Sequence, residues 1–384
     1  MGSPASSGQS NPGIESYRCA QCGAQLVYQP GSTQLECPYC GHTTPIAPPA
    51  TTVDEIPLAF SDKSRLNLEL ERDRVIHCNS CAAEFSVAAD EVTQSCPFCG
   101  SNVVVEAEPI HRITPNGLLP FAFRESKGRE FLLKWLGSRF WAPNNLKAQA
   151  LKHGRLDGMY IPYWTYDSDT TTSYTGMRGD HYWETESYTD SQGNSRTRQV
   201  RRTAWSFASG TVYVEFDDVL VLGSDSVSDK YGQRLSNWDL EALVPYETQY
   251  LVGFHTLRYS RDLERCWSTA QQFMQPEIDS SIRYDIGGDE QRITTKDTAY
   301  NDNSFKHILL PVFAGSYRYG QKNYNFLVNG RSGEVQGEAP ISFWKVLIAV
   351  ILALIVIGTA VFFYQKSEQG QGSSSGQSVE VLPF

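Results

Sequence analysis

The chain has 384 residues, enough for two or three domains, and its 40% hydrophobic and 12% aromatic content supports a packed core. Its formal net charge of -10 and its pI near 5.3 argue against a whole-molecule affinity for nucleic acid or anionic lipid, so any such binding must be local. The first seventeen residues contain neither the basic nor the apolar segment of a secretory signal, and we expect no export.

Eight of the nine cysteines form two sets with the same internal spacing. The first set is Cys19, Cys22, Cys37 and Cys40, and the second is Cys78, Cys81, Cys96 and Cys99. Each member of the second set lies 59 residues after its counterpart, which is an internal repeat. Two C-x-x-C pairs supply four thiolates that close a tetrahedron around one ion, so we predict two structural zinc ions, one in each set. A redox pair and rubredoxin-type iron are the alternatives.

Glycine follows the second cysteine of three of the four C-x-x-C knuckles, at Gly23, Gly41 and Gly100. A knuckle often needs a positive φ at this point, which glycine adopts without strain. Ala82 takes the place in the fourth knuckle. Because a site closed by four cysteines has no open position for a substrate, we expect these metals to hold the fold and not to catalyse.

The predicted fold class is α+β. The chain is predicted to contain two small zinc ribbons, a mainly antiparallel β-rich body and one C-terminal transmembrane helix. The segments are a disordered tail (1–17), ribbon 1 (18–44), a linker (45–74), ribbon 2 (75–105), the body (110–340), the membrane helix (345–364) and an outer tail (365–384). Ribbon 2 contains no lysine or arginine, and nucleic-acid binding requires basic side chains that contact phosphates. We therefore expect the ribbons to bind a protein partner and not nucleic acid.

The body begins with a basic segment, residues 124–155, which holds eight lysines or arginines and two glutamates. Apolar spacing predicts a helix over residues 125–140, a break at Pro143 and a second short helix. The segment also contains Trp135 and Trp141. It fits a domain helix with solvated bases, a contact with an anionic membrane surface, or a nucleic-acid contact.

The rest of the body is mostly strand-like. Residues 182–188 and 196–205 flank the turn cluster DSQGNS and predict a hairpin, with arginines on its second strand. Residues 262–275 predict a helix that ends at Pro276. Strands return over residues 305–337.

The sequence contains no phosphate-binding loop, no dinucleotide-binding loop, no nucleophile elbow and no H-E-x-x-H motif, and we expect no enzyme. The alternative is a hydrolase whose residues are dispersed in the body, around Asp217 and Asp218. We expect Cys266 to be a buried thiol and His255 and His307 to be packing residues.

Residues 346–364 contain nineteen residues without a charge and span about 28 Å as a helix, close to the hydrocarbon thickness of a bilayer. Trp344 and Tyr364 lie where interfacial aromatic residues belong, and Lys345 and Lys366 bracket the span. We therefore predict a single membrane span.

Six runs carry a family resemblance: GMYIPYWTYD, RTRQVRRTAW, FDDVLV, DIGGDEQRI, FKHILLPVF and VNGRSGEVQGEAP. Over about residues 75–340 the chain resembles uncharacterised bacterial membrane-anchored proteins with transcription-factor-IIB-type zinc ribbons, often labelled primosomal protein N′ or replication factor Y helicase. The chain has no motor motif that would fit a helicase. Some relatives accompany SPFH-domain and phage-shock-A-type membrane-stress proteins, and the resemblance implies a role as their membrane anchor.

Zinc thiolates need a reducing compartment, so we expect the bulk of the chain in the cytoplasm, a single pass through the cell membrane and a short tail outside. The function that we expect is a membrane-tethered, non-enzymatic adaptor whose ribbons recruit a protein partner. A tethered nucleic-acid factor and a hydrolase are the alternatives.

Overall fold

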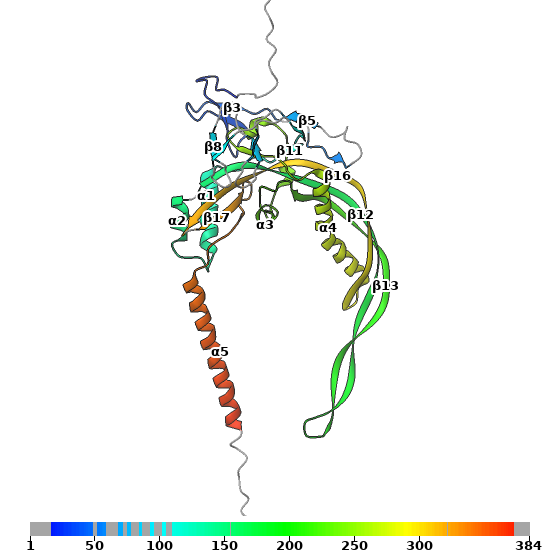
Figure 1. Cartoon of the computed structure of the whole chain (residues 1–384). Helices are drawn as coiled ribbons and strands as arrows, with labels where there is room; N and C mark the ends of the chain where they lie inside the picture. The colour runs from blue at the N-terminus through cyan, green and yellow to red at the C-terminus, as the bar shows by residue number, and fades with distance from the viewer. Residues whose placement is uncertain are drawn as a thin grey trace, which may run out of the picture.

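The computed structural model describes residues 17–48, 52–58, 68–71, 75–77, 84–86, 93–95, 102–104, 110–153, 155–320 and 322–371. The fold is α+β with a mostly antiparallel sheet, as predicted, and an apolar helix follows the body (Figure 1). The helices are α1 (Glu125–Ser138), α2 (Leu146–His153), α3 (Asp229–Gly232), α4 (Leu263–Ile286) and α5 (Phe343–Gln371), with two 3-10 turns, η2 (Leu240–Ala242) and η3 (Thr248–Leu251).

Strands β1 to β18 are seen within the described ranges. Those before α1 are β1 (Val27–Tyr28), β2 (Gln34–Glu36), β3 (Thr43–Pro45), β4 (Ile56–Pro57), β5 (Leu68–Glu71), β6 (Val75–His77), β7 (Glu84–Ser86), β8 (Thr93–Ser95), β9 (Asn102–Val104), β10 (Ile110–Ile113) and β11 (Gly117–Leu118). Those after it are β12 (Arg155–Thr189), β13 (Ser195–Leu222), β14 (Val244–Pro245), β15 (His255–Leu257), β16 (Glu290–Tyr319), β17 (Lys322–Asn329) and β18 (Val335–Gly337).

Strand β12 is the centre of the eleven-stranded main sheet. It pairs antiparallel with β16 along one edge. Along the other edge it pairs parallel with β15 and then antiparallel with β13. Its aromatic residues Tyr160, Tyr163, Trp164 and Tyr166 are all fully buried. They belong to three separate apolar clusters, so this strand contributes to every core of the body. The predicted hairpin is confirmed as the far end of the much longer β12–β13 pair.

Two bulges bend this sheet at the same point of β12. Between Tyr166 and Ser168 the register with β13 shifts, and just beyond it the register with β16 shifts. Asp218 and Asp302 adopt a positive φ there, and the Asp218 N–H donates to Asp167 Oδ1 at 2.6 Å. Bulges increase bending and twist, and beyond this point the long strands curve around α4 (Figure 1).

Helix α4 fills the concave side of the curved sheet (Figure 1). It begins as predicted, because the Asp262 side chain accepts a hydrogen bond from the Arg265 N–H at 2.8 Å and caps the first turn. The prediction that Pro276 ends the helix is wrong, since the helix continues for ten more residues to Ile286. Burial of the apolar face of α4 contributes more to stability than the backbone hydrogen bond that proline removes. That face is Leu263, Cys266, Trp267, Ala270, Met274, Ile278, Ile282 and Ile286.

The predicted helices of the basic segment are also confirmed, as α1 and α2. The segment predicted as a linker contains structured strands. β4 pairs with β16, and β5 pairs with β10.

We expect Ile278→Ala in α4 to lower the free energy of unfolding by about 2–5 kcal/mol, because this side chain is fully buried and its loss leaves a cavity. Thermal unfolding of the full chain in detergent measures the change. Tyr284→Ala on the same helix is the control, since Tyr284 is 90% exposed and its removal should change stability by less than about 0.5 kcal/mol. Equal effects of the two substitutions would contradict the packing described here.

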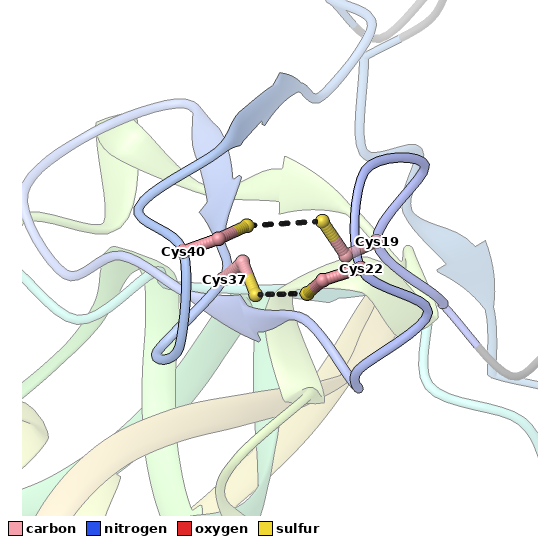
Figure 2. A group of neighbouring side chains, drawn as sticks. All are labelled: Cys19, Cys22, Cys37 and Cys40. Atoms are coloured by element: carbon pink, nitrogen blue, oxygen red, sulfur yellow. Dashed lines mark hydrogen bonds between the residues drawn. The ribbon is translucent and has the colours of Figure 1, made fainter.

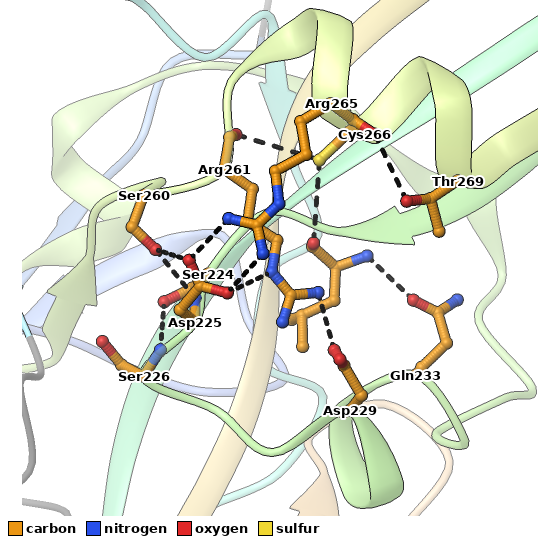
Figure 3. A network of polar contacts seen from close by, with 12 residues as sticks. Ser224, Asp225, Ser226, Asp229, Gln233, Ser260, Arg261, Arg265, Cys266 and Thr269 are labelled. Carbon is orange, nitrogen blue, oxygen red and sulfur yellow. Dashed lines mark hydrogen bonds and ion pairs between the residues drawn. The ribbon is translucent and has the colours of Figure 1, made fainter.

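A polar network joins the start of α4 to the loop that follows β13 (Figure 3). Asp225 accepts hydrogen bonds from Arg261 Nε at 2.7 Å and from Arg265 Nη1 at 3.0 Å, while Asp229 accepts one from Arg261 Nη1 at 2.6 Å. Partial burial acts to raise the pKa of Asp225, but the two guanidinium groups outweigh it and hold that pKa below its ordinary value.

This depressed pKa gives a pH prediction for Asp225→Asn. The carboxylate stabilises the fold above its unfolded pKa of about 3.9, and that contribution is lost as the pH falls through the lower folded pKa. We therefore expect the variant to melt below the wild type at neutral pH, and the difference to shrink below about pH 4. Melting curves of both proteins over a pH series test this, and a difference that does not change with pH would contradict it.

Candidate metal centre

The four cysteines of the first set converge at one point in the segment 18–44, here called module 1 (Figure 2). Cys19 Sγ lies 3.5 Å from Cys40 Sγ, and Cys22 Sγ lies 3.5 Å from Cys37 Sγ. All four sulfur atoms lie within 4.8 Å of one another, and all four cysteines are free. Tetrahedral coordination with metal–sulfur distances of about 2.3 Å places sulfur atoms somewhat under 4 Å apart. The cluster therefore fits a single metal ion.

The two knuckles of module 1 have the same backbone hydrogen bonds. The Gly23 N–H donates to the Cys19 carbonyl at 2.9 Å, and the Gly41 N–H donates to the Cys37 carbonyl at 3.0 Å. Both glycines have a φ of 74°, which confirms the prediction for these two positions. No atom lies within 4 Å of a Cβ added at either glycine, so the need for glycine is conformational and not steric.

Backbone N–H groups also prepare one thiol for metal binding. The N–H of Cys40, assisted by that of Tyr39, lowers the pKa of Cys37 to about 6 even though burial opposes ionisation. A metal binds the thiolate and not the thiol. The thiolate is therefore favoured at Cys37. In the same knuckle the backbone N–H of His42 acts to lower the pKa of Cys40, but burial and the neighbouring thiols outweigh it and raise that pKa.

Module 1 is packed against the body. The Tyr28 ring contacts the rings of Tyr250 and Phe254, with centroids 5.2 and 6.3 Å away. The Tyr28 N–H donates to the Val252 carbonyl at 2.9 Å, and the Gly31 N–H donates to the carbonyl of Phe121 at 2.8 Å. Cys19 and Cys37 themselves belong to the apolar cluster that includes the first part of the body. A metal ion held by these cysteines would thereby be coupled to packing in the body.

The described strands of the second repeat, here called module 2 (residues 75–105), copy the register of module 1. In module 1 Gln34 pairs with Pro45, and in module 2 Thr93 pairs with Val104, each partner 59 residues further on. The Arg18–Gln25 bridge likewise corresponds to the pair His77–Glu84. The sequence repeat is therefore a repeat of backbone pairing. Cys78, Cys81, Cys96 and Cys99 lie outside the described residues, as do Ala82 and Gly100.

Both modules join the same stretch of the body. Module 1 is bonded to Val252 through Tyr28, and module 2 pairs with β15 through β7, where Phe85 lies opposite Leu257. Val252 lies three residues before β15, so the two modules attach to neighbouring positions of the chain. The labelled module strands β3 and β8 lie at the end of the body opposite the far end of α5 (Figure 1).

The aspartates considered for a hydrolase lie at the β13 bulge. Asp217 lies with Glu55 and Asp167 in a group of carboxylates within 4.8 Å of one another. Lys306, which is 6% exposed, extends between them, with Nζ 2.8 Å from Asp218 Oδ1 and 3.1 Å from Glu55 Oε1. This ion-paired lysine offsets part of the acidic charge. Sequence reasoning missed Glu55 and Asp167, because only tertiary folding brings the β4 region to the bulge.

Two smaller expectations are also confirmed. Cys266 is fully buried, as predicted, and burial raises the pKa of its thiol to about 12. His307 has the expected packing role, stacked on Trp164 with centroids 4.6 Å apart. In the first half of the basic segment, Lys127 and Arg129 form ion pairs with glutamates of their own helix.

Helix α5 is long and apolar enough to cross a membrane over Phe343–Phe362. Its mean hydropathy is 2.7, and none of this stretch is buried against the rest of the protein. A row of exposed large apolar side chains is unfavourable in water and favourable in lipid. The helix is therefore a candidate for a single membrane span, at the position that the sequence predicted.

Comparisons with known proteins give one similarity over most of the chain. The chain is 25% identical over 343 residues to "Uncharacterized protein YdjG" of Bacillus subtilis (strain 168), which covers 87% of this chain and 92% of that protein. No family model and no solved structure matches. The name of that protein states no activity, so functional inference for this chain depends on the site itself.

We expect the double change Cys37→Ser/Cys40→Ser to remove one metal ion per chain from the purified protein. Two of the four sulfur ligands would be lost, and the remaining pair cannot complete a tetrahedral site. Elemental analysis by mass spectrometry, with the wild type purified in parallel, measures this difference. Cys266→Ala is the control, because this cysteine is outside the cluster and should leave the metal content unchanged. Equal metal content in the wild type and the double variant would contradict the assignment.

Proposed function

We propose that the protein is a membrane-tethered, non-enzymatic adaptor in which two structural zinc ions stabilise a platform that recruits a protein partner. The observation that carries the proposal is the closed group of four cysteines in module 1, docked on the body. Four thiolates saturate a tetrahedral zinc ion, so no position remains for a substrate. By the sequence repeat, module 2 holds the second zinc ion in the same way.

The recruiting surface that we propose contains Tyr39, between the two cysteines of the second knuckle in module 1. This side chain is 84% exposed although both neighbouring cysteines are needed for the metal. Tyrosine is enriched among the residues that dominate binding at protein interfaces. The repeat places Phe98 at the same position of module 2. A pair of aromatic residues on zinc-stabilised knuckles fits a protein partner.

The membrane tether in this proposal is α5. Thiolate ligands persist in a reducing compartment, so the body and both modules lie on the cytoplasmic side of the cell membrane and the residues after α5 lie outside. The arrangement of β3 and β8 opposite the far end of α5 directs the platform away from the bilayer, where a protein partner in the aqueous phase can reach it (Figure 1). The sequence resemblance favours an SPFH-domain or phage-shock-A-type protein as the partner.

Tyr39→Ala tests the recruiting role without removing a metal ligand. We expect the variant to keep its metal content and melting temperature, because the side chain is exposed, but to lose at least about tenfold in recovery of the partner, as expected for an interface anchor. The measurement is quantitative mass spectrometry of proteins that co-purify with the full-length chain in detergent. Tyr284→Ala, an exposed tyrosine on α4, is the matched control.

The results distinguish the candidate functions. A partner that is retained by Tyr284→Ala and lost by both Tyr39→Ala and Cys37→Ser/Cys40→Ser supports the adaptor. Unchanged recovery in all three variants contradicts it. Recovery of replication or transcription proteins alone, with salt-sensitive nucleic acid, would favour the nucleic-acid factor instead.

A further inference from the structure

The corner between α1 and α2 is attached to the first turn of α5. The Ser342 N–H donates to the Trp141 carbonyl at 2.7 Å. Lys345 Nζ donates to the carbonyl oxygens of Phe140 and Ala142 at 3.0 and 2.7 Å. These bonds place the corner at the point where α5 leaves the body (Figure 1). If α5 crosses a bilayer, this corner lies at the level of the lipid headgroups.

A cavity of about 250 Å³ opens at this corner, and three of its lining residues are cations. They are Arg139, Lys147 and Lys345, and none of the described lining residues is acidic. Arg139 stacks over the Trp135 ring, 4.3 Å from its centroid, which orients the guanidinium group. Lys147 Nζ lies where a Cβ on Gly137 would be, so the glycine makes room for this amine beside α1.

The charges of this cavity differ from those of the first half of α1. Lys127 and Arg129 there are paired with glutamates, whereas Arg139 and Lys147 make no ion pair among the described residues. The protein as a whole is acidic, with a formal net charge of -10. A cation cluster without acidic neighbours in an acidic protein indicates an anionic ligand.

Exposed apolar side chains lie next to Arg139 and at the start of α5, and three of them, Phe140, Trp141 and Ile341, line a neighbouring cavity that shares Arg139. These side chains are between 44% and 75% exposed, and they are Phe140, Trp141, Ile341, Phe343 and Trp344. Aromatic residues at the start of a membrane helix lie in the headgroup region. Apolar anchors beside a cationic cavity match a ligand with acyl chains and a negatively charged headgroup.

We propose that this corner is a binding site for the phosphate headgroup of an anionic phospholipid, with Arg139 and Lys147 as its ligands. Guanidinium and ammonium groups are the usual partners of phosphate. Lys345 contributes positive charge while it holds α5 against the corner. The proposal rests on the membrane span of the proposed function, and it adds a lipid specificity that a simple hydrophobic anchor lacks.

The test uses the full chain, purified in mild detergent and offered an equal mixture of phosphatidylglycerol and phosphatidylcholine. Native mass spectrometry measures which lipid remains bound. We expect the wild type to retain phosphatidylglycerol in preference to phosphatidylcholine. Arg139→Gln/Lys147→Gln should reduce this preference by about fivefold for each cation removed. The matched control Arg234→Gln/Arg283→Gln removes the same charge from two exposed sites that lie outside the hairpin, and this variant should retain the preference for phosphatidylglycerol.

Equal retention of the two lipids by the wild type, or an unchanged preference in the Arg139/Lys147 variant, would overturn the proposal. Displacement of phosphatidylglycerol by an equal concentration of inorganic phosphate would also overturn it in favour of a site for free phosphate. Extraction of membranes at alkaline pH tests the anchor separately. Loss of both the wild type and the variant into the soluble fraction would refute the span, whereas retention of both with no lipid preference would refute only the headgroup site.

Discussion

The pairing of one 35-residue strand, β12, along both of its edges is the constraint on which the rest of the molecule depends. In its N-terminal half, Tyr160, Tyr163 and Trp164 are buried in three different apolar clusters. The strand therefore contributes side chains to all three clusters. Its far half is held by β13 and β16 and curves around α4. Bulges at one point of β12 allow the change of direction, and the carboxylate of Asp167 satisfies the backbone there.

This strand also determines where the charged end of the hairpin lies relative to α5. The hairpin beyond α4 and the apolar helix leave the body on the same side (Figure 1). The arginines near the hairpin tip are exposed and pair across the strands, as Arg198 does with Glu186 and Arg202 with Glu184. Exposed ion pairs add little stability, but charged side chains are costly in hydrocarbon. If α5 spans a bilayer, the hairpin must stay in water or among headgroups, and this limits the tilt of α5.

The two cysteine modules show how a repeated small unit becomes part of a larger fold. A module of this size cannot bury enough apolar surface to be stable alone, and a metal ion supplies what the core lacks. Here packing adds to that stabilisation. Tyr28 lies against Tyr250, and β7 extends the main sheet through β15, so the platform is continuous with the body. Loss of a metal ion from this cluster would consequently disturb the body surface near Val252 as well as the knuckles.

Local patterns in the sequence determined the features that depend on residues close together in the chain. Cysteine spacing predicted the cluster of module 1, glycine predicted the positive φ at its knuckles, and uninterrupted apolar residues predicted α5. The sequence suggested that Pro276 ends α4, and only tertiary packing could reverse this, because burial of Ile278, Ile282 and Ile286 against the sheet exceeds the local cost. Tertiary structure alone also decided that the modules dock on one segment and that Lys306 meets Glu55, since such contacts join residues whose separation along the chain leaves no periodic signal.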